Sequence, residues 1–596
     1  MFSLFYLKML VMKKFLLLVA VALMANASVN AEKRTKSQLL SVASEVLQDK
    51  GLKTVSANNA NDKLQILDNS FAHISIVGYK NGSYVVVAND DEIPAVIGYS
   101  DKAVSYDSEN MAPAFKWYLE TVNRNIQECL ANGTTLPLTG VSPEFKPEVP
   151  MLCQTQWSQG EPYNRLTPTF SNGGYDEHYV TGCVATAMAQ AMKYYNYPEQ
   201  GRGRIKYSFN SDEGSTEKVS MRFDEEPFDW DNMLNQYYTY KYNDDQAYAV
   251  AYLMKSTGAS VRMGYHINGS GAFTIDAASA FYTFFKYDIA TECYHKDFLC
   301  TDEWFDIAYR SLSNGHPLIF GASSSIGGQD AGHSFVVDGY NADGLVHVNF
   351  GWAGDSDGYY SLLDMHGYDH GFEMIPLKKP SEDSHITSLW GQWQDNLSYN
   401  TVTGATKVNI INSSARDFSG KIAVILKNLA DGSEQMLGYM NYTDEGMIKD
   451  GNYYNVINYA VEAPLPEDLK DGDYRLFLAS KGAWKVKDDP TDRHAEEKLV
   501  EEATWQPVRA SDGFKNSILI TVSNGEVTSK ADKNSNWVLG IENIVNENHA
   551  SDVVRVYDVQ GRMVYTSSAD NFRIADVPAE GMLIIKNGSE VRKVIK

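Results

Sequence analysis

The chain has 596 residues, which is too long for one hydrophobic core, so we expect several domains. Its 76 acidic and 52 basic residues give a net charge of −24, and such an acidic surface disfavours nucleic acid and anionic lipid as partners. The hydrophobic content of 43% is typical of globular domains and argues against a disordered chain.

The N-terminus is typical of a secretory signal peptide. Lysines precede the apolar run Phe15–Leu23, which is short for a membrane-spanning helix, and small residues follow it. We expect cleavage after Ala27, which removes residues 1–27, with Ala31 as an alternative site and Met12 as an alternative start. The sequence therefore predicts an exported protein with no integral membrane span after signal removal.

The cysteines do not form the framework of a disulfide-rich protein. There are five of them in 596 residues, and the odd number leaves at least one free thiol. Cys293 and Cys300 can pair if a turn lies between them. A free thiol in an exported protein calls for a functional explanation.

Residues 28–150 predict a small α+β unit followed by a linker. The segment 136–150 contains four prolines, and we expect it to be extended, exposed and open to proteolysis. The predicted elements before it are a helix over Ser37–Lys50, a hairpin of His73–Val77 and Ser83–Asn89, and a helix over Ala114–Ala131.

Residues 151–379 contain the first candidate catalytic residue, a cysteine at the start of a predicted helix. The apolar positions after Cys183 recur with helical spacing as far as Tyr195, and Gly182 permits a sharp entry. In the first helical turn, free N–H groups and the helix dipole favour a thiolate. The alternative is a buried structural cysteine.

A thiolate nucleophile needs a base, and His333 is the candidate. It opens a predicted strand that a turn connects to a second strand over Leu345–Phe350. Because residue 341 is midway between His333 and Asn349, we expect these two residues to be nearly opposite each other, with the amide fixing the histidine tautomer. Trp352 could shield the pair from water; His333 could alternatively be a structural histidine.

Residues 380–530 predict a β-sandwich, and residues 537–596 predict a compact β module. A polar linker is expected over Ser523–Asn536. Short alternating runs separated by Asp, Gly and Asn predict strands at Thr406–Ile411, Lys421–Lys427, Tyr474–Leu478, Ser517–Val522, Val553–Tyr557, Met563–Tyr565 and Met582–Lys586.

Four motifs in this order resemble the streptopain-like (C10) family of papain-fold cysteine peptidases, especially its multidomain Bacteroidetes members. They are Trp157–Asn164, Thr181–Ala187, Gly332–Gly339 and His347–Trp352. The resemblance implies an α+β, papain-like domain. Cys183 would be its nucleophile, His333 its base and Gln159 its oxyanion donor, while Asn349 would orient the histidine and Trp352 would cover that pair. The family has Trp where this chain has Phe350, and Gly where it has Ala353.

The flanking regions resemble other parts of the same proteins. Residues 83–91 and 93–100 are similar to the family's inhibitory pro-domain, although Asn89 replaces its usual Gly. Residues 556–562 and 593–596 are similar to a type IX secretion sorting domain, which implies export to the medium or the outer-membrane surface. The partners implied are protein or peptide substrates, the chain's own pro-domain as inhibitor, and the secretion machinery.

Two other functions remain open. A surface binding protein with an inactive peptidase scaffold would lack the nucleophile or the base, yet both are present. A Cys-dependent acyl transferase would use the same acyl-enzyme, so the sequence does not separate it from a peptidase. No cofactor or metal is implied, because no zinc-binding spacing of Cys and His occurs and the Asp355–Gly358 segment lacks most ligands of a calcium loop.

Overall fold

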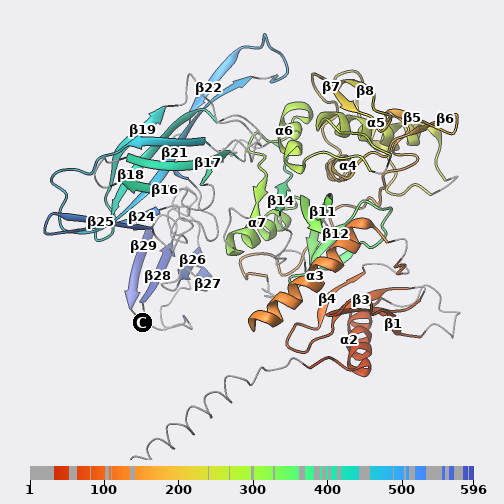
Figure 1. Ribbon diagram of the computed structural model, residues 1–596, viewed down its shortest axis with the longest axis horizontal. Coiled ribbons are helices and arrows are strands. Elements are labelled where there is room, and N and C mark those ends of the chain that lie inside the picture. Colours follow the sequence, from red (N-terminus) through yellow and green to blue (C-terminus); the bar gives the residue numbers. More distant parts are fainter. Residues whose placement is uncertain are drawn as a thin grey trace, which may run out of the picture. The chain divides into compact units, whose positions relative to one another are not determined.

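The computed structural model divides into two compact units (Figure 1). The first contains residues 1–140, 343–345 and 355–367, and the second contains the rest. The predicted signal peptide lies outside the described residues, and none of the helices within them is both long and apolar enough to span a membrane. The structure describes residues 32–52, 63–80, 82–100, 106–108, 111–134, 141–238, 241–267, 269–296, 301–326, 329–361, 370–380, 389–391, 397–400, 405–412, 418–441, 457–487, 489–501, 505–508, 517–531, 553–557, 563–568, 577, 582–587 and 590–595.

The first unit is an antiparallel sheet that packs against two helices, α2 and α3. Its strands run in the order β1-β2-β3-β4-β13, so the last strand comes from much later in the sequence. Thr35 and Gln38 form a capping box that starts α2, and Leu39, Ala43 and Leu47 bury one face of the helix in the sheet core. The elements are α2 (Lys36–Asp49), β1 (Gln65–Asp68), β2 (Ile74–Gly78), β3 (Tyr84–Ala88), β4 (Val96–Ser100), α3 (Pro113–Asn132) and β13 (Gly358–Tyr360). Both predicted helices and the predicted hairpin are confirmed.

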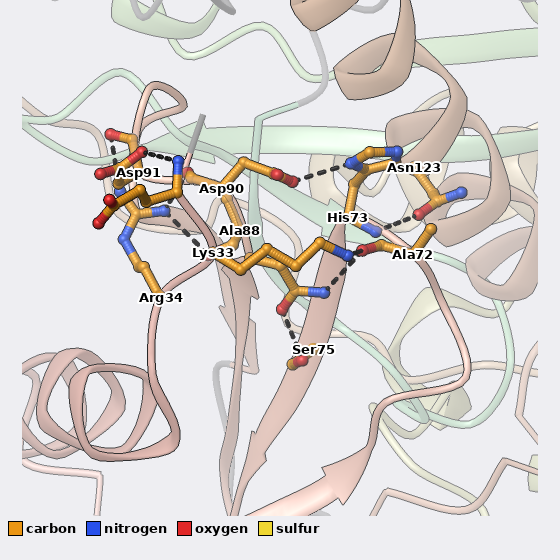
Figure 2. Close-up of polar contacts among 11 residues, drawn as sticks. Lys33, Arg34, Ala72, His73, Ser75, Ala88, Asp90, Asp91 and Asn123 are labelled. Carbon is orange, nitrogen blue, oxygen red and sulfur yellow. Dashed lines mark hydrogen bonds and ion pairs between the residues drawn. The ribbon is translucent and has the colours of Figure 1, made fainter. Parts of the chain in front are cut away.

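Polar contacts fix the chain before α2 to the turn between β3 and β4 (Figure 2). The Arg34 guanidinium donates to the carbonyl oxygens of Ala88 at 2.9 Å and Ile93 at 2.7 Å, and also to that of Asp90. The Asp90 carboxylate accepts a hydrogen bond from Nδ1 of His73 at 2.8 Å. One arginine therefore satisfies several carbonyl groups of a turn that leaves the sheet ladder.

The catalytic region of the second unit combines a helical cluster with an antiparallel sheet in the order β12-β11-β10-β14-β9. Its core joins α4, α5 and α6 to the buried Trp157. The elements are β5 (Thr169–Asn172), β6 (Tyr175–His178), α4 (Cys183–Tyr195), β7 (Arg204–Asn210), β8 (Thr216–Arg222), the 3-10 helix η1 (Trp230–Asn232), α5 (Asp244–Ser260), α6 (Thr274–Phe285), β9 (Tyr294–His295), α7 (Thr301–Ser313), β10 (Leu318–Ile326), β11 (Gln329–Tyr340), β12 (Val346–Asn349) and β14 (His370–Pro376).

The segment 136–150 is not a free linker along its whole length. Val149 is buried and forms an antiparallel bridge with Tyr340 of β11, with N–H to carbonyl distances of 2.8 and 2.9 Å. The Arg310 guanidinium lies over the Phe145 ring, with its central carbon 5.3 Å from the ring centroid. Among the described residues 141–150, most of the chain is exposed or half-buried, as the prolines predict, but the prolines did not predict the contacts of Phe145 and Val149.

Two C-terminal sheets share one hydrophobic core, as in a β-sandwich. One has the order β15-β17-β16 with β20 beside β17, and the other has the order β19-β18-β21-β24-β25 with β22 and β23 beside β21. A further sheet has the order β27-β26-β28-β29. The strands are β15 (Leu389–Gly391), β16 (Leu397–Asn400), β17 (Ala405–Asn412), β18 (Gly420–Asn428), β19 (Glu434–Asn441), β20 (Ile457–Glu462), β21 (Gly472–Lys487), β22 (Glu497–Glu501), β23 (Gln506–Pro507), β24 (Ser517–Ser523), β25 (Glu526–Ala531), β26 (Val553–Tyr557), β27 (Met563–Ser568), β28 (Met582–Asn587) and β29 (Glu590–Ile595).

The predicted linker over Ser523–Asn536 is wrong in its first half. Strand β25 occupies Glu526–Ala531 and pairs with β24 through a two-residue turn. The turn residues Asn524 and Gly525 have φ of 52° and 79°, which is the backbone that an Asn-Gly hairpin turn requires. The low apolar content concealed a strand that the turn dipeptide could have revealed.

Candidate active site

The nucleophile stands at the first residue of α4, as the sequence predicts. Gly182 precedes it with φ of +88°, and a Cβ at this position would lie 2.6 Å from the sulfur of Met263 and 3.0 Å from the carbonyl oxygen of Ser270. A glycine is therefore required for the chain to enter the helix here. The backbone N–H of Val184 points to the Cys183 sulfur, as expected at the N-terminus of a helix.

His333 lies on β11, opposite Ala322 of β10, and is hydrogen-bonded to Cys183. Its Nε2–H donates to the backbone carbonyl of Phe350 at 3.1 Å. A carbonyl oxygen only accepts hydrogen bonds, so Nε2 carries a proton and Nδ1 is the nitrogen left for the thiol. The structure thus brings together the two residues that the sequence pairs as nucleophile and base.

The two groups shift each other's pKa in opposite directions. Burial by itself raises the pKa of the Cys183 thiol, but the charge and hydrogen bond of His333, with the backbone N–H of Ser334, lower it below its ordinary value. Burial lowers the pKa of His333, but the Cys183 thiolate and the Phe350 carbonyl raise it overall. Both shifts favour a thiolate–imidazolium pair over the neutral pair.

The predicted pairing of His333 with Asn349 across the hairpin is wrong. Val336 is opposite Asn349, and Tyr340 is opposite Val346, which centres the turn on residue 343. A bulge next to Asp338 moves the register back by one residue, so Val336 is opposite Asn349 and not residue 350. The sequence estimate centred the turn on residue 341 and assumed a regular ladder.

Asn349 is buried behind the site, and its described side-chain bonds go to groups other than the histidine. Its Oδ1 accepts from the N–H of Gly351 at 3.0 Å and from the Gln190 amide at 3.0 Å. Its Nδ2 donates to the carbonyl of Thr155 at 2.7 Å. Asn349 reaches His333 through the chain, because it precedes Phe350, whose carbonyl binds the ring.

The other two predicted residues flank the pair. Gln159 is half-buried, and its carbonyl accepts from the N–H of Thr181 at 3.1 Å, which fixes it beside the entry to α4. Trp352 is half-buried, and its Nε1 is a buried atom with no hydrogen-bond partner among the described residues. The roles of oxyanion donor and aromatic cover remain predictions for these side chains.

Phe350 occupies the position where the resembled family has Trp. Its ring is buried and lies 5.5 Å from the ring of Phe335, which in turn is 6.1 Å from the ring of His333. Ala353, where the family has Gly, has φ of +57°, which is strained for a residue with a Cβ. The smaller aromatic ring is accommodated in the core, whereas the alanine keeps a glycine-like backbone.

Sequence reasoning missed two features of the site. The Phe350 carbonyl could not be foreseen, since every residue has a carbonyl and only the register shows which one meets the histidine. Gln190 is completely buried in α4. It lies seven residues after Cys183, on the same helix face, and a glutamine within an otherwise apolar or small run was a usable signal.

Comparison with known proteins agrees with this geometry. Residues 157–360 match the Peptidase C10 family, and residues 31–126 match the Spi protease inhibitor family. Streptopain of Streptococcus pyogenes is 28% identical over 308 residues, covering 49% of this chain and 74% of streptopain. Thiol protease/hemagglutinin PrtT of Porphyromonas gingivalis is 31% identical over 304 residues, covering 48% of this chain and 33% of PrtT. A solved fragment of Prevotella intermedia prointerpain A is 34% identical, covering 53% of this chain and 98% of the fragment, with a TM-score of 0.47.

The hydrogen-bonded thiol and imidazole, together with these matches, define a cysteine peptidase preceded by an inhibitor-like domain. Within that class, the chain belongs to the peptidase C10 family and is streptopain-like.

Proposed function

We propose that the chain is an exported zymogen whose mature form is an endopeptidase acting through Cys183 and His333. The observation that carries this proposal is the hydrogen-bonded Cys183–His333 pair at the N-terminus of α4, with pKa shifts that favour the charged form of both groups. A nucleophile activated by an adjacent base, which a third group orients, is the arrangement that covalent acyl transfer requires.

In the proposed reaction, the Cys183 thiolate attacks the scissile carbonyl carbon and forms a C–S bond. The carbonyl oxygen becomes negatively charged and accepts hydrogen bonds from the Gln159 amide and the Cys183 backbone N–H. The His333 imidazolium gives its proton to the leaving amine as the C–N bond breaks. Water, deprotonated by the neutral His333, then hydrolyses the thioester and restores the thiolate. Phe350 keeps the ring oriented throughout, through the contact to Nε2.

Each of the remaining regions is assigned a role from its own supporting observation. Proteins or peptides are the substrates, and the pro-domain, residues 28–150, inhibits the enzyme until it is removed, since residues 31–126 match an inhibitor family. Residues 1–27 direct export as a signal peptide. The final module, which we place at residues 537–596, addresses the protein to the type IX machinery and so to the medium or outer-membrane surface. For that step the support is the sequence motifs alone.

The test compares residues 28–596 as wild type with Cys183→Ala and His333→Ala. We expect wild type to shorten and to hydrolyse casein, and both variants to lose at least about a thousandfold in rate. Cys153→Ala is the matched control, because this buried thiol lies outside the catalytic pair and its loss should leave hydrolysis within about threefold. Equal hydrolysis by wild type and Cys183→Ala would contradict the proposal, as would a folded wild type that digests nothing after its pro-domain is removed.

A further inference from the structure

Gln190 is a buried amide that connects three segments of the active site. It lies in α4 and has no exposed surface. Seven residues correspond to two helical turns, so Gln190 is beneath Cys183 on the same face of the helix. A buried amide costs free energy unless it is hydrogen-bonded, which makes its partners informative.

The amide oxygen of Gln190 binds the segment that leads to Gln159. It accepts from the hydroxyl of Thr155 at 3.0 Å and from the backbone N–H of Trp157 at 3.1 Å. Both Thr155 and Trp157 are buried. Gln159 follows two residues later, so this oxygen connects α4 to the segment of the proposed oxyanion donor, in addition to the Thr181–Gln159 contact at the helix entry.

The amide nitrogen of Gln190 binds the segment that holds the histidine. It donates to Oδ1 of Asn349 at 3.0 Å, and the same oxygen accepts from the N–H of Gly351 at 3.0 Å. These contacts fix the residues on both sides of Phe350. The Phe350 carbonyl, which accepts from Nε2 of His333, is therefore positioned by an amide on the helix of the nucleophile.

We propose that Gln190 is a positioning residue, which sets the geometry of both the imidazole and the oxyanion segment relative to Cys183. This inference rests on the proposed Cys183–His333 chemistry. Gln190 touches neither Cys183 nor His333 in the contacts described, so it acts through Asn349, Phe350 and Trp157. The amide is suited to this task because a single planar group supplies an acceptor to one segment and a donor to the other.

Two variants separate the two sides of the amide. Gln190→Leu removes both, whereas Gln190→Glu keeps the oxygen that binds Thr155 and Trp157 but loses the donor to Asn349 once its carboxyl is ionised. We expect kcat to fall about 10- to 100-fold in Gln190→Leu, with KM within about twofold, because small displacements of catalytic groups are costly and the buried amide has no access to substrate. Gln190→Glu should reproduce most of this loss if the histidine side dominates.

The pH profile distinguishes positioning from a general loss of stability. The Phe350 carbonyl helps to raise the pKa of His333, so its displacement should move the alkaline limit of kcat/KM to lower pH by about half a unit or more. Thr257→Val is the matched control. This buried threonine of α5 donates to the carbonyl of Ala185 in α4 at 3.0 Å but does not contact the Gln190 network. It should lower stability without moving the alkaline limit.

All rates are normalised to the fraction of enzyme that an irreversible thiol reagent titrates. Wild-type kcat and pH limits in both Gln190 variants would overturn the inference, as would an equal shift of the alkaline limit in Thr257→Val. If Gln190→Leu does not fold, Gln190→Glu alone decides the matter by the same two readouts. Failure of the proposed function is recognised separately, by activity that persists in Cys183→Ala.

Discussion

At the residue scale, the start of α4 depends on Gly182, because a side chain there would meet the Met263 sulfur. We predict that Gly182→Ala lowers kcat/KM at least about 100-fold, since the helix entry and Cys183 must shift to make room. Gly214 also has positive φ, at +79°, but a Cβ there would have no neighbour within 4 Å. Gly214→Ala should leave kcat/KM unchanged in the same peptide assay, and a loss as large as that of Gly182→Ala would contradict the steric argument.

Ala353 offers the opposite experiment, because its φ of +57° favours glycine. We predict that Ala353→Gly stabilises the protein by about 0.5 to 1 kcal/mol, as relief of the left-handed strain exceeds the added entropy of the unfolded chain. Urea unfolding in the Cys183→Ala background, which lacks the proposed nucleophile, would measure it. A lower midpoint at unchanged slope would show that the strain is not relieved.

At the scale of elements, the pairing of α4 with β11 determines the pH range of activity. The pKa of Cys183 is lowered, so its thiolate forms at a lower pH than an ordinary cysteine's, and the raised pKa of His333 keeps the imidazolium to a higher pH than an ordinary histidine's. We predict a bell-shaped kcat/KM profile whose alkaline limit lies above about 6.5, the ordinary histidine value. The pH dependence of Cys183 alkylation should show the same acid limit. A single transition near the ordinary thiol pKa would contradict an ion pair.

The elements show which patterns carry structural information and which do not. Helical spacing of apolar residues identified α4, and an Asn-Gly turn between two apolar runs identified β2 and β3, because local sequence dictates both. The register of β11 and β12 depends on a bulge and on turn length, which this sequence does not encode in an obvious residue. The Phe350 carbonyl that accepts from His333 and the bridge between Val149 and Tyr340 both depend on long-range strand pairing, so the local sequence did not predict them.

In the first unit, Arg34 is the residue that closes the turn after β3. We predict that Arg34→Leu destabilises this unit by about 1 to 3 kcal/mol, because the carbonyl groups of Ala88 and Ile93 lose their hydrogen bonds from the half-buried guanidinium. Hydrogen exchange of the turn amides would measure the change. Lys33→Leu is the control, as this exposed lysine donates only to the carbonyl of Ala72 among the contacts described and should have a smaller effect. Equal protection in wild type and Arg34→Leu would exclude the closing role.

At the scale of the whole molecule, the backbone bridge between Val149 and Tyr340 limits where an activating cut can fall. A protease binds an extended segment, and Val149 is engaged with Tyr340 by two backbone hydrogen bonds while Leu152 donates to the carbonyl of Asp338 at 2.9 Å. We predict that the mature N-terminus lies before Val149. N-terminal sequencing of the shortened product identifies this residue. A first residue beyond Leu152 would show that the Val149–Tyr340 bridge opens before cleavage.

The strand order of the first unit has a consequence for the timing of folding. β13 completes its sheet, with Tyr360 opposite Gly98, and the Tyr360 ring lies 5.4 Å from that of Phe115 and 5.1 Å from that of Tyr118. A chain that emerges N-terminus first cannot pair β4 with β13 until residue 360 is available, and closing so long a loop carries an entropic cost. The segment that is made first is thus finished late, because its last strand is made only after nearly all of residues 157–360, which match the peptidase family, have been synthesised.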